Sequence, residues 1–267
     1  MPDENLIFIK LGGSLITDKN TPNTARREVI SNLATEIKRA SSQLSKLKII
    51  IGHGSGSFGH SAGDKYQTRT GVSTPQGWEG FLEVWQAAHA LDQIVLEYCQ
   101  SAGLPVVAFP PSASVMTTDR KFLHWNLVPL IAALNAGLTP LVMGDVVFDQ
   151  QLGGTILSTE EVFVYLAQHL QPCKILLAGI EPGVWEDYPD CKKIIPRITN
   201  ISQINITNSL QGSASIDVTG GMKTKAELMF KLAQKIPGLQ AQIFSAQDPD
   251  NLYQAIMGTP IGTLITN

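Results

Sequence analysis

Short β-rich runs alternate with helical patterns along nearly the whole chain, and this alternation limits the possible folds more than any other feature. Strands that alternate with helices form βαβ units, which build a largely parallel sheet with helices on both faces. The sequence therefore predicts an α/β fold. The expected strands are residues 6–11, 47–51, 105–109, 140–147, 175–178, 242–244 and 263–266, and the expected helices are 27–44, 80–102, 127–135, 159–170, 221–236 and 252–257.

The clearest helix is the segment 80–102, where apolar side chains recur every three or four residues until Gly103 stops the pattern. Ser158 and Glu161 have the spacing of a capping box. In this motif each side chain accepts a hydrogen bond from the other residue's backbone N–H at the start of a helix. The helix that starts at this capping box ends before Pro172, since proline cannot continue it. We predict a boundary there between two lobes, residues 1–172 and 173–267.

Composition excludes several classes of protein. Hydrophobic residues make up 43% of the 267 residues and charged residues 16%, which rules out a disordered chain. The net charge of −3 argues against nucleic-acid binding, which needs a basic surface. No apolar run approaches the roughly 20 residues of a membrane span, and the acidic start lacks the basic region of a signal peptide. Three widely spaced cysteines, interpreted as core residues, fit a reducing compartment, so we expect a soluble cytoplasmic protein without a structural zinc site.

Three glycine-rich turns, each after a strand, are the candidate sites of chemistry. They begin near Gly12, Gly52 and Gly220, and each has a lysine or histidine beside it. Glycines let backbone N–H groups approach an anion closely, and lysines add point charges for phosphate oxygens. Three such turns suit a polyphosphate together with an acceptor. None has the G-x-x-x-x-G-K-[ST] spacing of a P-loop or the G-x-G-x-x-G context of a dinucleotide site.

Five motifs, in order along the chain, resemble the amino acid kinase family and within it the isopentenyl phosphate kinase branch. The first and last are shared across the wider family, whereas G-S-F-G-H is specific to the branch. The motifs are K-L-G-G-S-L-I-T-D-K from Lys10, G-S-G-S-F-G-H from Gly54, P-P-S-A from Pro110, G-D-V-V-F-D from Gly144 and D-V-T-G-G-M-x-x-K from Asp217.

The resemblance implies an open αβα sandwich with an acceptor-binding lobe over 1–172 and an ATP-binding lobe over 173–267. It implies transfer of the γ-phosphoryl of Mg²⁺-ATP to isopentenyl monophosphate by direct in-line attack, and a homodimer. Lys10, Lys19 and Lys225 would be catalytic. Ser55, His60 and Gly144 would bind the acceptor, with no metal ligands assigned in the chain. Nucleotide contacts would come from Lys10, Gly12, Gly13, Ser14, Gly56, Gly221 and Lys225.

The acceptor's hydrocarbon tail needs an apolar pocket, and the inner side of the helix 80–102 is a candidate wall, with Phe81, Val84, Trp85 and Ala88. The other histidines are interpreted as structural: His53, His89, His124 and His169.

This sequence also departs from the family pattern. Glu160 stands where an aspartate usually orients the lysines, Ser55 replaces a third glycine, and residues 178–185 lack the usual Asp-rich turn. Two alternatives stay open. One is a kinase for another phosphate or phosphonate acceptor, of the fosfomycin type. The other is a nucleotide-binding sensor that no longer catalyses.

Overall fold

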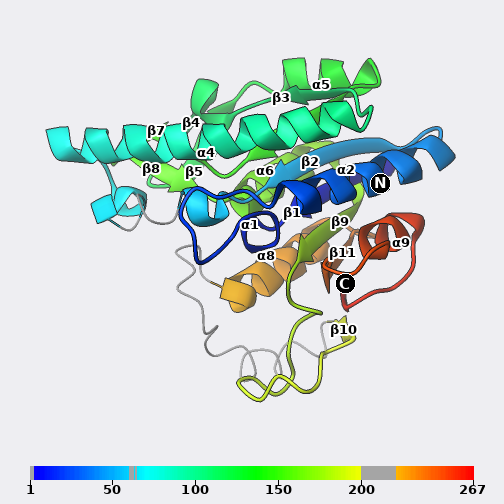
Figure 1. Ribbon diagram of the computed structural model, residues 1–267. Helices are drawn as coiled ribbons and strands as arrows, with labels where there is room; N and C mark the ends of the chain where they lie inside the picture. The colour runs from blue at the N-terminus through cyan, green and yellow to red at the C-terminus, as the bar shows by residue number, and fades with distance from the viewer. Residues whose placement is uncertain (1–2, 60–62, 64, 200–220) are drawn as a thin grey trace.

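The computed structural model describes residues 3–59, 63, 65–199 and 221–267, and it confirms the α/β sandwich (Figure 1). The main sheet has the order β10-β12-β11-β9-β1-β2-β6-β3, and every neighbouring pair is parallel except β11 with β12. Its strands are β1 (Asp3–Leu11), β2 (Lys48–His53), β3 (Val106–Ala108), β6 (Thr139–Met143), β9 (Pro172–Gly179), β10 (Arg197–Ile198), β11 (Gln240–Ser245) and β12 (Thr263–Ile265).

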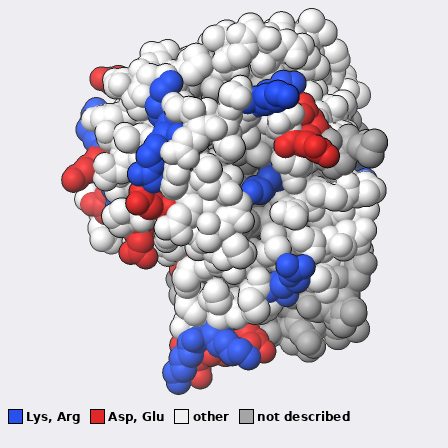
Figure 2. All heavy atoms as spheres, turned by 90° about the vertical axis from the view of Figure 1, so that its right-hand side faces the viewer, with Lys and Arg blue, Asp and Glu red and all other residues white. Residues whose placement is uncertain are grey.

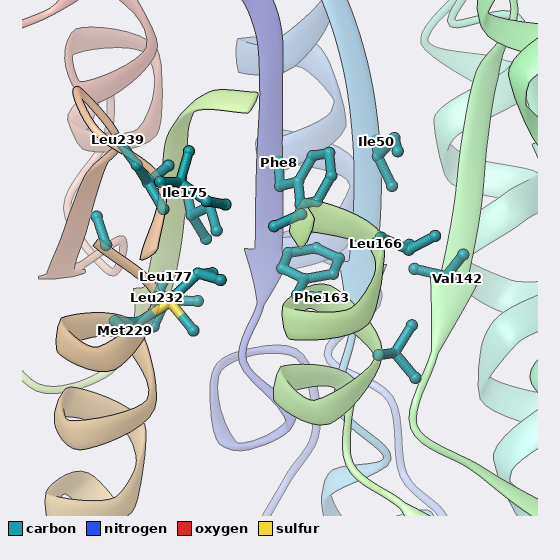
Figure 3. Packing of buried hydrophobic residues seen from close by; sticks show 14 of the residues in the cluster. Phe8, Ile50, Val142, Phe163, Leu166, Ile175, Leu177, Met229, Leu232 and Leu239 are labelled. Carbon is teal, nitrogen blue, oxygen red and sulfur yellow. The ribbon is translucent and has the colours of Figure 1, made fainter. Parts of the chain in front are cut away.

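The alternation of side chains along β1 divides the core into two layers. Leu6 and Phe8 belong to one apolar cluster, whereas Ile7 and Ile9 belong to another on the opposite face of the sheet. The Phe8 cluster is covered by α5 (Val128–Asn135), α6 (Thr159–Leu170) and α8 (Gly221–Lys235), and the Ile7 cluster by α2 (Arg27–Gln43), α4 (Pro75–Ser101) and α9 (Asn251–Met257). In the first layer the rings of Phe8 and Phe163 pack with centroids 5.1 Å apart (Figure 3).

Most predicted elements are confirmed, but two need correction. The helix expected over 80–102 is α4, which begins five residues earlier, because Thr74 caps it and Pro75 occupies its first position. The strand expected over 140–147 is two strands, β6 and β7 (Asp145–Asp149), which lie in different sheets. The chain changes sheet at Gly144, where a Cβ would lie 3.2 Å from the Leu157 carbonyl oxygen.

A second sheet of four strands, in the order β5-β4-β7-β8, was not predicted. It adds β4 (Val115–Thr118), β5 (Lys121–Trp125) and β8 (Gly153–Leu157). The two-residue turn between β4 and β5 places Asp119 and Arg120 at φ +48° and +61°. The Asp149 carboxylate stabilises this unusual turn by accepting hydrogen bonds from both of their backbone N–H groups, at 3.1 and 2.9 Å.

Asp149 also accepts hydrogen bonds from Thr117 Oγ1 at 2.7 Å and from the Gln151 and Leu152 N–H groups at 2.9 Å. Burial opposes its ionisation, but these bonds outweigh burial and hold the pKa of Asp149 well below its usual range.

We expect Asp149→Asn to lower the free energy of unfolding by about 2 kcal/mol at pH 7, because it weakens several charge-assisted hydrogen bonds at once. Since the folded-state pKa is depressed, the contribution is present above the unfolded value of about 3.9 and is lost as the pH falls below it. Urea unfolding at pH 7 and pH 3 measures this. Asp190→Asn, at an exposed carboxylate 4.0 Å from Lys192 Nζ, is the control and should change little. An equal effect of Asp149→Asn at both pH values would contradict the interpretation.

The main sheet is continuous across Pro172, where β9 begins. Strands that precede Pro172 (β1, β2, β3 and β6) fill one half of the sheet, and strands from Pro172 onward (β9 to β12) fill the other. The assignment of these halves to separate lobes stays a prediction.

Of the three cysteines that the sequence placed in the core, Cys99 is buried, whereas Cys173 and Cys191 are only half-buried. On the face drawn in Figure 2, positive and negative side chains form small interspersed groups separated by uncharged areas. Across the residues that are described, no helix combines the length and the apolar character needed to cross a bilayer. Cys99, Cys173 and Cys191 are free thiols. Burial, with a smaller effect of Asp92, raises the pKa of Cys99 to about 12, which fits a core residue.

Candidate active site

The first two glycine-rich turns pack directly against each other. The Gly54 N–H donates to the Leu11 carbonyl oxygen at 3.1 Å, and a Cβ on Gly13 would collide with the Gly56 backbone. Thr17 fastens the two turns: its hydroxyl donates to the Gly13 carbonyl oxygen at 2.7 Å and accepts from the Ser57 N–H at 3.0 Å. The absence of side chains at Gly13 and Gly56 is therefore a requirement of this contact, and it leaves backbone groups from both turns side by side.

Lys10, near the carboxyl end of β1, forms a buried ion pair with Glu160. Lys10 has the same parity along the strand as Phe8, so its side chain lies on the face covered by α6 and α8. Glu160 is in the first turn of α6, which begins with the predicted capping box of Ser158 and Glu161. Gly52 lets this helix approach β2 closely, since a Cβ there would lie 2.6 Å from the Phe163 ring.

Lys225, on α8, acts on the same carboxylate. Burial opposes ionisation of Glu160, but the charges of Lys10 and Lys225 outweigh it and lower the pKa of Glu160 below its ordinary value. Two lysines separated by 215 positions in the chain therefore converge on one buried anion. Gly221 opens α8 with φ +66°, whereas Gly220, its partner in the third turn, lies outside the described residues.

The remaining predicted site residues are placed as follows. Ser55 lies between the Gly54 and Gly56 backbone groups that contact Gly13, and Ser14 is in α1 (Gly13–Ile16). Lys19 is exposed on the turn between α1 and α2, and it is not among the side chains that the contacts above join to Glu160. His60 lies outside the described residues.

One backbone carbonyl connects the parts of the predicted acceptor site. The His53 carbonyl oxygen accepts a hydrogen bond from Thr159 Oγ1 at 2.6 Å and from the Gly144 N–H at 3.3 Å. Thr159 precedes Glu160, and His53 precedes the turn that carries Ser55. Gly144, the Ser55 turn and the start of α6 are therefore fixed relative to one another.

The predicted apolar wall on α4 is divided between two environments. Phe81 and Val84 are buried in a small cluster with Val72 and Val146, whereas Trp85 is 38% exposed. Trp85 Nε1 donates to Ser112 Oγ at 3.2 Å. A groove of about 570 Å³ runs along another side of α4, beside the second glycine turn, and is lined by Asn23, Phe58, Lys65, Glu83, Gln86, Ala87 and Ala90.

Sequence reasoning missed how two groups of side chains pair with one another around this site. Four form two His–Asp contacts between α4 and strand ends: His53 with Asp92, and His89 with Asp145. In the other group Glu161 pairs with Arg69 and Arg120, each at 3.1 Å. The capping box was the only sequence signal for Glu161, and the partners in each group are too far apart in the chain for spacing to reveal them.

A sequence model described as the amino acid kinase family matches residues 5–245, most of the chain and all five motifs. The chain belongs to the amino acid kinase family.

Within the amino acid kinase family, this chain is similar to proteins named isopentenyl phosphate kinase. The one from Methanocaldococcus jannaschii is 35% identical over 266 residues, covering 97% of this chain and 98% of the relative. The one from Methanothermobacter thermautotrophicus is 29% identical and covers 98% and 99%. Among solved structures, an isopentenyl phosphate kinase is similar with a TM-score of 0.82 at 26% identity, covering 98% of this chain and 100% of that one. The product complex of the Thermoplasma acidophilum enzyme, at 23% identity and a TM-score of 0.77, shows the shared fold.

Proposed function

We propose that this kinase transfers the γ-phosphoryl group of ATP to isopentenyl phosphate and forms isopentenyl diphosphate. An oxygen of the acceptor phosphate forms the new bond to the γ-phosphorus, the bond from that phosphorus to the β-phosphate oxygen breaks, and ADP leaves. The full-length similarity to isopentenyl phosphate kinases supports the acceptor. The observation that carries the reaction type is the convergence of Lys10 and Lys225 on Glu160, beside the second glycine turn, where a Cβ on Gly54 would lie 3.9 Å from Lys10 Cε.

The residues have complementary tasks in this reaction. Phosphoryl transfer needs positioning and charge neutralisation more than it needs a base, because a phosphate acceptor is already ionised. Lys10 and Lys19 would flank the transferring group, and Lys225 would hold the phosphates of ATP. Glu160 is already paired with Lys10, so its role is to orient lysines. The longer glutamate side chain reaches the lysine where the family usually has aspartate.

The site residues fit a nucleotide and its Mg²⁺ ion. Gly13 and Gly56 pack against each other so closely that neither position could carry a side chain, so a nucleotide approaching these turns would meet backbone groups. Among the described residues, no three His, Cys, Asp or Glu side chains gather as metal ligands, so the nucleotide phosphates and water would coordinate the ion. When bound, Mg²⁺ neutralises charge on the phosphates. The residues before Pro172 would hold the acceptor and those after it the nucleotide.

The proposal includes a cytoplasmic homodimer. β3 is an edge strand of the main sheet, and large apolar side chains are exposed on or near it and on α5. They are Val107, Val128, Ile131 and Leu138.

ADP release in the presence of isopentenyl phosphate tests the proposed reaction. We expect turnover that depends on this acceptor, a kcat at least ~100-fold lower for Lys19→Ala with nucleotide binding retained, and a raised acceptor KM for His60→Ala. Lys46→Ala, at an exposed lysine before β2, is the control and should be neutral. Turnover with a phosphonate such as fosfomycin but not with isopentenyl phosphate would show that the acceptor is a phosphonate and contradict the proposed one. Nucleotide binding without any turnover would favour the alternative of a nucleotide-binding sensor that no longer catalyses.

A further inference from the structure

His53 is a buried histidine at the end of β2 whose ring has two polar neighbours. Its Nε2 lies 2.9 Å from Asp92 Oδ1 on α4, and its Nδ1 lies 3.3 Å from the Gly54 carbonyl oxygen. His53 is 1% exposed and Asp92 3% exposed. Burying two polar side chains is costly unless they are paired, and this pair lies next to the predicted acceptor turn. We therefore ask what the pair does for that turn.

The two neighbours of the ring are both hydrogen-bond acceptors. The contact of Nε2 with Asp92 fixes the orientation of the ring, and an N–H at Nδ1 can then donate to the Gly54 carbonyl oxygen. The surroundings of His53 therefore hold the Gly54 carbonyl group in one direction.

This contact determines where the next N–H group points. In a planar trans peptide the C=O and N–H groups point in opposite directions. Since the Gly54 carbonyl oxygen faces the His53 ring, the Ser55 N–H faces away from that ring. We propose that His53, held by Asp92, is a positioning residue that aims the Ser55 N–H at the acceptor phosphate. The proposal rests on the proposed function.

The second His–Asp contact shows that α4 holds both sides of the predicted acceptor site. His89 lies one helical turn before Asp92, and its Nε2 is 3.5 Å from Asp145 Oδ2. Asp145 follows Gly144, and its carboxylate also accepts from the Ser112 N–H at 2.9 Å. The helix α4 therefore fixes the distance between the Ser55 turn and Gly144. The hydrogen bond from the Gly144 N–H to the His53 carbonyl oxygen links the same two parts directly.

Two substitutions of His53 separate its positioning role from its contribution to stability. The amide nitrogen of asparagine occupies about the place of Nδ1, so His53→Asn keeps a donor for the Gly54 carbonyl oxygen but leaves Asp92 unpaired. The amide nitrogen of glutamine occupies about the place of Nε2, so His53→Gln keeps the Asp92 contact but loses the donor to Gly54. The double variant His53→Asn with Asp92→Asn removes the unpaired charge should the single variant fail to fold.

The measurements are the melting temperature, the dissociation constant of isopentenyl phosphate by calorimetry, and KM and kcat from ADP release. We expect His53→Gln to raise the acceptor KM and dissociation constant about tenfold, with the KM for ATP unchanged. His53→Asn, or the double variant, should keep acceptor values within about threefold of wild type. The melting temperature should follow the opposite order, with His53→Gln above His53→Asn.

Acceptor affinity that simply follows the melting temperature, or that His53→Gln leaves unchanged, would overturn the positioning role. The proposed function fails separately, if the wild-type protein binds isopentenyl phosphate without releasing ADP; the dissociation constants then still decide the role of His53. Absence of both binding and turnover in the wild-type protein would overturn both proposals.

Discussion

Lys10→Met lowers kcat by about 100- to 1,000-fold in the expected result, with a smaller effect on the KM for ATP. The reason is that a preorganised cation beside the transferring phosphoryl group matters most where negative charge builds in the transition state. Methionine retains most of the length and apolar volume of the lysine stem, so the change removes mainly the charge. ADP release at saturating acceptor and ATP measures the effect.

Lys174 provides a matched control on the neighbouring strand. It is half-buried, burial lowers its pKa, and its Nζ donates to the Ala255 carbonyl oxygen at 3.3 Å. It pairs in register with Ile7, away from the carboxyl end of β1. We expect Lys174→Met to change kcat by less than about threefold. Equal losses from the two substitutions would show that Lys10 acts through stability alone.

Glu160→Ala should lower the free energy of unfolding at pH 7 by about 3–5 kcal/mol, because it removes one partner of a buried ion pair with Lys10. The pKa of Glu160 is lowered in the folded state, so its stabilisation is complete above the unfolded value of about 4.3 and is lost as the pH falls below it. The difference between wild type and variant should therefore shrink in acid. Urea unfolding across pH 3 to 7 measures this difference.

Two further variants test the partnership between Glu160 and Lys10. Glu160→Asp keeps the charge but moves it by one methylene group, and we expect kcat to fall about 10- to 100-fold because positioning is sensitive to shifts near 1 Å. The double variant Lys10→Met with Glu160→Gln should be more stable than the sum of the single effects predicts, since both single changes remove the same ion pair. Additive effects of the two single changes would contradict direct coupling.

The sequence predicted the main sheet and its helices because each of those elements carries a local signal. The apolar period of α4 and the capping box of α6 are patterns formed by residues close together in the sequence. The second sheet carries no such signal: the turn at Asp119 and Arg120 lacks glycine, and its positive φ angles depend on Asp149, about thirty residues away.

The candidate site divides in the same way. Lys10 stands out because it is a charged residue near the end of a buried strand, just before two glycines. The interaction of Lys225 with Glu160 and the pairing of His53 with Asp92 depend on how α6, α8 and α4 pack on the sheet. Such partners become visible only once the fold is known, so the turns were predicted and the side chains that hold them were missed.

The place of β1 in the sheet has a consequence for how this site can change. From β1 the chain crosses through α2 on one face to reach β2, whereas β9, on the other side of β1, is entered from α6 on the opposite face (Figure 1). Winding therefore reverses beside β1, and such a reversal opens a crevice at the carboxyl ends of parallel strands whatever the loops contain. The position of the proposed site is thus set by the path of the chain, and we expect substitutions in the surrounding turns to alter the preferred acceptor without moving that site.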